Sequence, residues 1–273
     1  MSAYYLLIFV LFLLLYFNTF RELVAVWSSD QDYGHGFLIL PMSLYLLWKK
    51  REELISQPIH PSQWGIGILT FWAFLYAVGL IGQISTIEDV SMLFFPIGAV
   101  AVLINRNAAR IFLFPAFFMI FMFPIPSEIY TRVTNPLLLV STTMSFHILD
   151  ALNLPVLQEG NLLTLPNYTM QVVLACSGIR SLLSILALAF IMGYLMTPSN
   201  ILRLIFFFIA VPIAILGNIT RITVTALLAY LVSPGAAEGY SHTFAGLVTF
   251  GLSFILLYGC MEFIAWFSRK REL

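Results

Sequence analysis

The chain has 273 residues, of which 60% are hydrophobic and 10% are charged, with equal numbers of acidic and basic side chains. A soluble domain carries about 25% charged residues, so this composition excludes a soluble globular protein and indicates an integral membrane protein. The two cysteines, Cys176 and Cys260, form neither a zinc-ligand spacing nor a Cys-X-X-Cys motif, so we expect no metal and no other cofactor.

Eight apolar runs approach the length that a transmembrane helix needs, which is about 20 residues. They cover residues 4–20, 37–48, 64–82, 90–104, 111–124, 179–196, 204–232 and 244–267. The first run lacks a basic segment before it and a small-residue cleavage site after it, so we interpret it as a retained helix and not as a signal peptide. The seventh exceeds one span, and Pro212 and Gly217 predict kinks in it. The pattern predicts an all-α polytopic membrane protein with about eight transmembrane helices in a single domain, residues 1–273.

A less apolar insertion lies between the fifth and sixth runs, at about residues 127–175. Pro124 and Pro126 end the preceding helix, because proline removes a hydrogen-bond donor and clashes with the turn before it. Apolar residues near helical spacing predict an amphipathic helix over residues 127–154. The Pro166-Asn167 turn signal predicts a small β-hairpin over residues 162–174. We expect the amphipathic helix and the hairpin on the outer face of the membrane.

Basic residues are distributed unevenly between the two sides of the predicted bundle. One side receives Lys49, Lys50, Arg51, Arg106, Arg110, Arg203, Arg269, Lys270 and Arg271. The other side receives only Arg21 and Arg132 as loop cations. Because cytoplasmic loops carry the excess of lysine and arginine, we place both termini in the cytoplasm and the 127–175 insertion outside the inner or plasma membrane.

Three polar segments interrupt or flank the later apolar runs, namely Ala175-Cys-Ser-Gly-Ile-Arg180, Gly217-Asn-Ile-Thr-Arg221 and Tyr240-Ser-His242. Polar and ionisable groups near hydrocarbon are costly, so such groups are candidates for function. The topology places Cys176 and His242 at the outer starts of the sixth and eighth spans. Arg221 lies 18 residues past Arg203, about 27 Å along a helix, and also reaches the outer face. The same arithmetic puts Cys260 near the inner leaflet, which leaves Cys176 as a free thiol.

The residue types at this outer face suit a thiol nucleophile. Cys176 opens a helix, where the helix dipole favours a thiolate, and Arg180 lies four residues later on the same face. Both features lower the pKa of a thiol, and only the thiolate attacks well. We expect His242 to pair with the thiolate and move protons, and Arg221 to hold a substrate carbonyl or the developing oxyanion.

Several segments resemble the signature blocks of the exosortase/archaeosortase family. They are residues 171–180 (Gln-Val-Val-Leu-Ala-Cys-Ser-Gly-Ile-Arg), Asn218-Ile-Thr-Arg221-Ile and Ser241-His242-Thr-Phe-Ala-Gly246. The similarity extends to Asp32-Tyr-Gly-His35-Gly and Phe123-Pro-Ile-Pro126, so it covers most of the chain. The histidine of the third block is similar to the bacterial exosortases, because an arginine is usual in the archaeal branch.

The resemblance implies a membrane cysteine peptidase, acting as a transpeptidase on proteins with a C-terminal sorting signal. That signal consists of a short motif such as Pro-Glu-Pro, a transmembrane helix and a basic tail. Cys176 is implied as the nucleophile of an acyl-thioester, with Arg221 and His242 as its partners. The secondary candidates are Arg180, Asn218, Ser177 and His35. Family descriptions often make the arginine the proton donor, so the split of roles between Arg221 and His242 stays open.

The implied partners follow from this chemistry. Water, or an amine on a surface glycan or lipid, would resolve the thioester. Membrane lipid would surround the substrate's helix, and no nucleic-acid partner is expected.

Each candidate residue also has a purely structural interpretation. Cys176 alone is consistent with an inert buried thiol, and Arg180 with a side chain that snorkels to the interface. Arg221 is consistent with a clamp between helices through Asn218 and Thr225, and His242 with a hydrogen-bonding residue at the interface. His35 with Asp32 either supports the catalytic residues or lines a substrate entrance, or else caps a helix or orders a loop.

Two other classes of function stay open. A membrane acyl- or glycosyl-lipid transferase would use Arg221 and His242 to hold a phosphate or carboxylate, and Cys176→Ser would then keep most activity. A transporter would carry inverted repeats and polar residues through the bilayer depth. In this sequence we find no such repeat, and the polar residues gather at one face.

Overall fold

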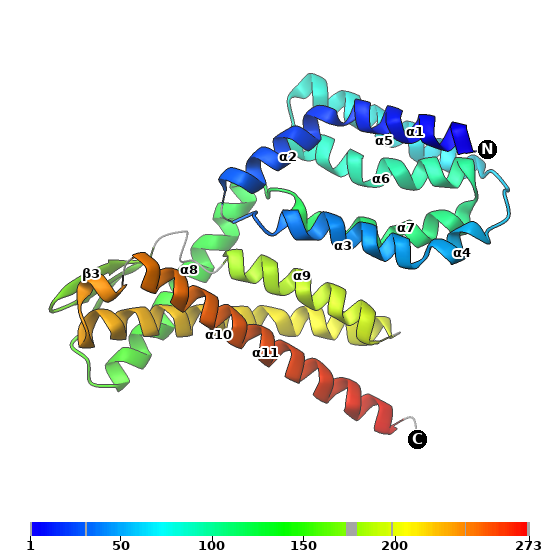
Figure 1. Ribbon diagram of the computed structural model, residues 1–273. Helices are drawn as coiled ribbons and strands as arrows, with labels where there is room; N and C mark the ends of the chain where they lie inside the picture. The colour runs from blue at the N-terminus through cyan, green and yellow to red at the C-terminus, as the bar shows by residue number, and fades with distance from the viewer. Residues whose placement is uncertain (1, 31, 173–178, 198, 238, 272–273) are drawn as a thin grey trace. The chain divides into compact units, whose positions relative to one another are not determined.

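The computed structural model describes residues 2–30, 32–172, 179–197, 199–237 and 239–271, without the side chains at 2–5, 236–243 and 268–271 (Figure 1). The chain packs as two compact units, Met1–Pro126 and Ser127–Leu273. Both units are built from helices, and the second also carries a small sheet.

The first unit is formed by α1 (Ser2–Leu15), α2 (Phe17–Ser29), α3 (Gly36–Lys49), α4 (Arg51–Ile55), α5 (Gln63–Gly82), α6 (Ser85–Leu103), α7 (Arg106–Met119) and the 3-10 turn η1 (Ile120–Met122). The first predicted span is divided at Tyr16, whose backbone (φ −96°, ψ 15°) leaves the helical region. α2 then continues to Ser29, whereas the first predicted apolar run ends at residue 20 and the polar residues that follow it were expected to form a connection. The helix persists because Thr19, Leu23 and Trp27 bury one face of it at four-residue spacing.

α6 packs against both α5 and α7 in the first unit. Leu93, Ile97 and Ala101 recur every four residues and join a buried cluster with α7. Gly98 faces α5, where a Cβ atom would lie 2.8 Å from the backbone nitrogen of Leu69. The glycine therefore allows the two helices to approach more closely than a larger residue would.

The second unit is formed by α8 (Ser127–Ala151), β1 (Leu157–Glu159), β2 (Leu162–Leu165), β3 (Tyr168–Gln171), α9 (Ile179–Met196), α10 (Asn200–Leu231), the 3-10 helix η3 (Pro234–Ala237) and α11 (Gly239–Arg271). The strands form an antiparallel sheet in the order β1-β2-β3, with Leu165 opposite Tyr168. The predicted hairpin is confirmed. β1 was not predicted, because three residues are too few to show alternation; Gly160, with a φ of 62°, turns it into β2.

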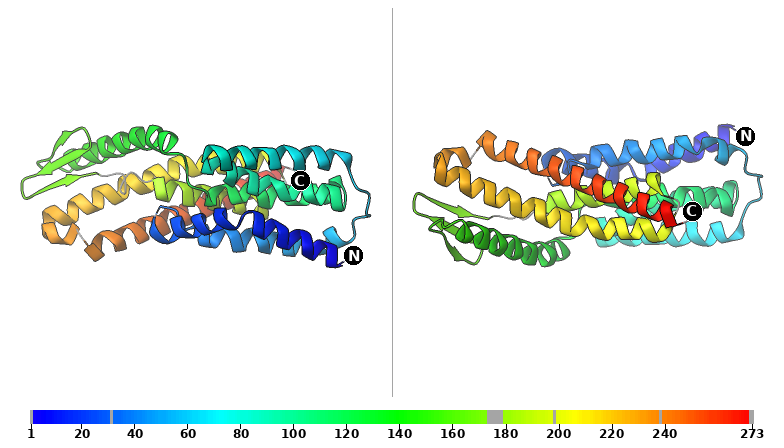
Figure 2. Two further views of the ribbon diagram at one scale, coloured as in Figure 1. Left: turned by 90° about the horizontal axis from the view of Figure 1, so that it is seen from above. Right: turned by 90° about the horizontal axis from the view of Figure 1, so that it is seen from below.

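α10 runs without a break through the second unit and packs against α8, α9 and α11 (Figures 1 and 2). Its 32 residues extend for about 48 Å, which exceeds the hydrocarbon thickness of a bilayer. Pro212 lies inside the helix. The sheet is attached near the helix end, where the Asn167 side chain donates a hydrogen bond to the Ala229 carbonyl (3.1 Å).

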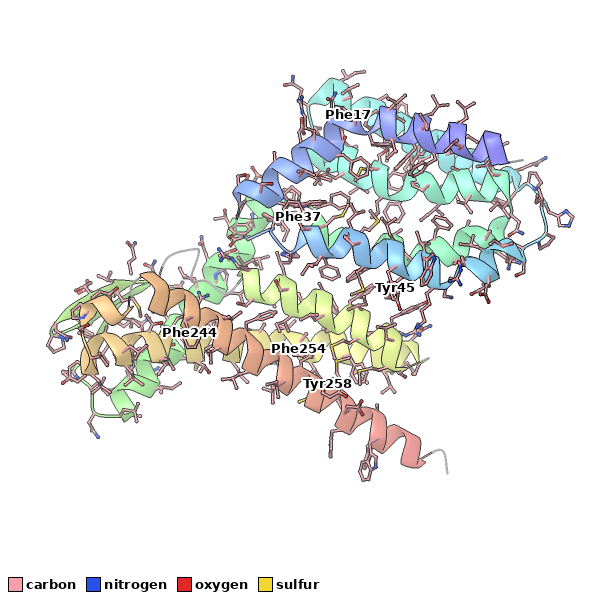
Figure 3. All side chains as sticks on the ribbon, viewed as in Figure 1. Phe17, Phe37, Tyr45, Phe244, Phe254 and Tyr258 are labelled. Carbon is pink, nitrogen blue, oxygen red and sulfur yellow. The ribbon has the colours of Figure 1, made fainter. Side chains whose placement is uncertain are left out.

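The helices have the length and surface of membrane spans. Among the described residues, 5 helices are each long and apolar enough to cross a membrane, namely α5, α6, α9, α10 and Phe244–Phe267 of α11. The number rises to 7 if α1 with α2 and α7 with α8 each count as one span. α3 is a shorter apolar helix. Exposed aromatic side chains project from the helices, as Figure 3 shows for Phe17, Phe37, Tyr45, Phe244, Phe254 and Tyr258. The chain is therefore a mostly helical, polytopic membrane protein, and the count of eight stays a prediction.

Candidate active site

Three polar residues form a stripe on α10. Asn218, Arg221 and Thr225 follow one another at spacings of three and four residues, which places them on one face of the helix. Asn218 and Thr225 are each 3% exposed, and the Nε atom of Arg221 is buried. We call these three residues the polar strip. A guanidinium and a carboxamide supply several N–H donors, so the polar strip can bind a carbonyl oxygen or an anion.

Small residues of α8 and α11 surround the polar strip. Ser145 of α8 donates a hydrogen bond to a backbone carbonyl of α10 (3.2 Å). Gly217 lies so close to Ser253 of α11 that a Cβ atom on the glycine would overlap the serine hydroxyl. Gly246 of α11 faces Arg221, and a Cβ atom on that glycine would lie 3.8 Å from the arginine Cδ atom. Small side chains let these helices approach closely, so protein rather than lipid encloses much of the strip.

The carboxamide of Asn218 is buried, yet neither its Oδ1 nor its Nδ2 atom has a hydrogen-bond partner among the described residues. Asn105 of the first unit is also buried and is bonded at both ends. Its Nδ2 donates to the Pro58 carbonyl (2.6 Å), and its Oδ1 accepts from the Ala108 N–H (2.7 Å). An unpaired buried polar group costs about 1–3 kcal/mol and is rare in proteins. Asn218 is therefore a candidate binding group.

The described residues on either side of the 173–178 segment belong to buried clusters that include residues of α10. Val172, which is 1% exposed, belongs to a buried cluster that includes Ile222. Ile179, which is 2% exposed, belongs to another that includes Ala214. Ala214 and Ile222 each lie four residues, about one turn, from Asn218 and share its face. Val172 is further held by Asn161, which exchanges two 2.9 Å hydrogen bonds with its backbone.

The predicted site residues are distributed as follows. Cys176 and Ser177 lie outside the described residues. Arg180 is the second residue of α9 and is half-buried. His242 belongs to α11, four residues before Gly246 and so on the same helix face, and its side chain is not among those described. His35 lies in the first unit.

His35 takes part in a small polar cluster at the end of α7. Its Nε2 atom lies 2.9 Å from the Phe121 carbonyl. The Trp27 indole donates to the Met122 carbonyl (2.8 Å). These bonds fix the chain that leaves η1. His35 therefore contacts the chain that leaves η1, as its loop-ordering interpretation requires, and its role in the site stays a prediction.

Tyr33 completes this cluster, because its hydroxyl accepts a hydrogen bond from the Ile125 N–H (3.0 Å). The two family-like segments at residues 32–36 and 123–126 thus meet in space. Burial raises the pKa of the Tyr33 hydroxyl above its ordinary value. Burial also lowers the pKa of His35, against the opposing hydrogen bonds to the backbone of Phe121 and Asp32. Because the Phe121 carbonyl can only accept, the Nε2–H of His35 donates in their hydrogen bond.

Two residues of the first unit were missed by sequence reasoning. Trp27 was not singled out, although its place on the Thr19–Leu23 stripe could have revealed it. Asp89 lies between the predicted runs at residues 64–82 and 90–104, but α6 begins at Ser85 and buries Asp89 to 4% exposure. Its spacing of four residues from Leu93, on the buried face, was the available signal. Among the described residues, no group of three His, Cys, Asp or Glu side chains is placed to hold a metal ion.

Comparison with known families gives one match over most of the chain. The family model described as transmembrane exosortase matches residues 27–259, which include both the His35 cluster and the polar strip. Comparison with curated proteins and with solved structures gives no match.

Proposed function

Because the chain belongs to the transmembrane exosortase family, and is thus a membrane sorting enzyme of the exosortase type, we propose that it is a cysteine peptidase/transpeptidase. It cleaves C-terminal sorting signals of exported proteins through a thioester on Cys176. The observation that supports this most directly is the polar strip. Val172 and Ile179, which flank the cysteine segment, share buried clusters with Ile222 and Ala214 of α10, the helix that carries Asn218 and Arg221.

The second catalytic partner is supported by α11. Gly246 faces Arg221, and His242 lies one helical turn before Gly246 on the same face. A guanidinium and an imidazole from two helices can thus serve one reacting group. This arrangement favours Arg221 for binding the substrate carbonyl and His242 for moving the proton, because arginine cannot readily give up its proton.

The proposed reaction has two steps. In the first, His242 accepts the Cys176 proton and the thiolate sulfur attacks the scissile carbonyl carbon, whose oxygen becomes negative beside Arg221. The carbon–nitrogen bond then breaks, and the released amine of the C-terminal fragment takes the proton from His242. In the second step, His242 takes a proton from water or from an amine on a surface glycan or lipid as this nucleophile attacks the thioester carbon; the carbon–sulfur bond breaks, and the departing thiolate takes the proton back from His242.

The topology that goes with this function has eight spans. The eight apolar runs lie largely on α1 with α2, on α3, α5 and α6, on α7 with η1, and on α9, α10 and α11. The asymmetry of basic residues supports cytoplasmic termini and a site on the extracytoplasmic face. The family match crosses the boundary between the two packing units, which supports a single functional domain over residues 1–273. The substrate's own transmembrane helix would lie in lipid against this bundle.

A tagged substrate with a motif, a transmembrane helix and a basic tail tests the proposal. Wild-type protein should convert it to the processed form, and Cys176→Ala should remain folded and leave it intact. Mass spectrometry of wild-type protein incubated with substrate should reveal an acyl adduct on Cys176. Processing by Cys176→Ala would refute the covalent mechanism. Near-normal activity of Cys176→Ser would instead favour a transferase that holds a phosphate or carboxylate with Arg221 and His242.

A further inference from the structure

We propose that Asn218 binds the main chain of the substrate, through a pair of hydrogen bonds to one residue next to the scissile bond. The inference rests on the function proposed above and goes beyond it by assigning a ligand to this side chain. Its starting observation is that Oδ1 and Nδ2 of Asn218 are both buried and both lack partners among the described residues. A structural asparagine in this same protein, Asn105, is bonded at both atoms.

The chemistry of the carboxamide selects the ligand. A carboxamide presents an acceptor and a donor side by side. In an extended peptide, one residue presents its N–H and its C=O toward the same side, as in the paired residues of an antiparallel sheet. The two therefore match atom for atom. A phosphate or a carboxylate would accept from Nδ2 but would repel the Oδ1 atom, so an anion is a poor fit.

The position of Asn218 selects the part of the peptide. Asn218 precedes Arg221 by three residues, which is about 4.5 Å along the helix axis. An extended peptide advances about 3.3 Å per residue. If Arg221 holds the scissile carbonyl, Asn218 therefore reaches a residue one or two places away. Because main-chain atoms are the same in every peptide, this contact supplies orientation without restricting the side chains of the substrate.

A stability measurement separates this role from a structural one. Replacing an unpartnered buried carboxamide by an apolar group of similar shape removes a desolvation cost, so Asn218→Leu should raise the melting temperature of the purified protein by about 3 °C. Asn218→Ala serves as a second variant in case leucine overpacks the site. The matched control Asn105→Leu should lower the melting temperature, because it breaks two hydrogen bonds. A fall in both Asn218 variants would mean that Asn218 is bonded within the protein, and would overturn the proposal.

A binding measurement then tests the ligand. The parent is Cys176→Ala protein in lipid nanodiscs. The probe is a synthetic peptide with a Pro-Glu-Pro motif, an apolar helix and an Arg-Lys tail, in which each main-chain N–H near the motif is replaced in turn by an ester oxygen. One ester should weaken binding to the parent about 5-fold, and Asn218→Leu should weaken binding of the all-amide peptide about 10-fold. In the Asn218→Leu protein, that same ester should cause no further loss of binding affinity, because the carboxamide that bonds the replaced N–H is already absent.

The outcomes of the binding measurement are distinct. If every ester weakens binding by the same factor in the Asn218→Leu protein as in the parent, the assignment of Asn218 is overturned, while the proposed function stays intact. No binding of any peptide by the parent would instead overturn the proposed substrate class, and the inference with it. Thr220→Val, on the exposed side of the same helical turn, should change neither the affinity nor the ester pattern, since the Thr220 hydroxyl is bonded within α10 to the Leu216 carbonyl (2.9 Å).

Discussion

Gly217→Ala tests whether the contact between α10 and α11 is set by the smallest possible side chains. A Cβ atom at this position would overlap the Oγ atom of Ser253, whereas the Cβ atom of Ser253 would stand 3.4 Å away. The hydroxyl is therefore the obstacle. It already donates to the Thr249 carbonyl (2.9 Å), so turning it aside breaks that hydrogen bond.

The expected effect of Gly217→Ala on the free energy of unfolding is the sum of three contributions. Overpacking costs about 1–3 kcal/mol, and loss of the serine hydrogen bond costs about 1 kcal/mol. Replacing glycine by alanine inside a helix returns up to about 1 kcal/mol. Gly217→Ala should therefore lower the free energy of unfolding by about 1–3 kcal/mol. In a Ser253→Ala background the obstacle is absent, so the same change should be neutral or stabilising by up to about 1 kcal/mol.

The assay is a double-mutant cycle of unfolding free energies, measured by denaturant titration in mild detergent. The expected coupling between the two positions is about 2 kcal/mol. Gly246→Ala is the matched control: the new methyl group would lie at ordinary contact distance, 3.8 Å from the nearest atom of Arg221, so it should be tolerated in either background. If Gly217→Ala lowers the free energy of unfolding equally with and without the Ser253 hydroxyl, the hydroxyl is not the obstacle and the packing argument is refuted.

Two further predictions concern the first unit. Trp27→Phe leaves the Met122 carbonyl without its donor and should lower the free energy of unfolding by about 1–3 kcal/mol. The control Trp64→Phe, at a residue that is 77% exposed, should change it by less than about 0.5 kcal/mol. Equal effects of the two variants in a denaturant titration would argue against the hydrogen bond of Trp27. Because burial lowers the pKa of His35 below its ordinary 6.5, the unfolded chain binds more protons, so stability should be present at pH 7.5 and be lost as the pH falls below about 6.5 toward the folded-state pKa. His35→Gln keeps a donor without a titrating ring and should flatten this part of the melting-temperature profile; an unchanged slope would contradict the assignment.

Much of the fold could be predicted because a bilayer forces the backbone to satisfy its own hydrogen bonds. Long apolar runs then become helices with few alternatives. Each predicted run lies largely on helix, although the first is divided between α1 and α2, and the Pro166-Asn167 turn lies between β2 and β3 as expected. Turn chemistry and hydropathy are local properties, so a single sequence carries them.

The errors arise where tertiary packing overrides composition. The polar stretch after residue 22 is helical because Leu23 and Trp27 continue the buried stripe of α2. Asp89 is buried because α6 begins earlier than its apolar run does. In both cases a charged or polar side chain was taken as the end of a helix, although one face of that helix was still covered by neighbouring elements.

The candidate site was predicted in its residue types but not in its environment. The sequence predicts that Arg221 reaches the outer face, because this depends only on helix length. It cannot predict that Asn218 is buried without a partner, since that depends on how closely α8 and α11 approach. Nor does it predict that Trp27, Tyr33 and His35 hold the segment after α7, because those bonds join residues more than 80 positions apart.

The unbroken course of α10 has a mechanical consequence. Asn218, Arg221 and the carbonyl of Ala229 that holds the sheet are all carried by this one continuous helix. A helix longer than the local hydrocarbon thickness accommodates the difference by tilting. A change of tilt would therefore shift the depth of these three groups together, while the intervals between them along the helix are preserved.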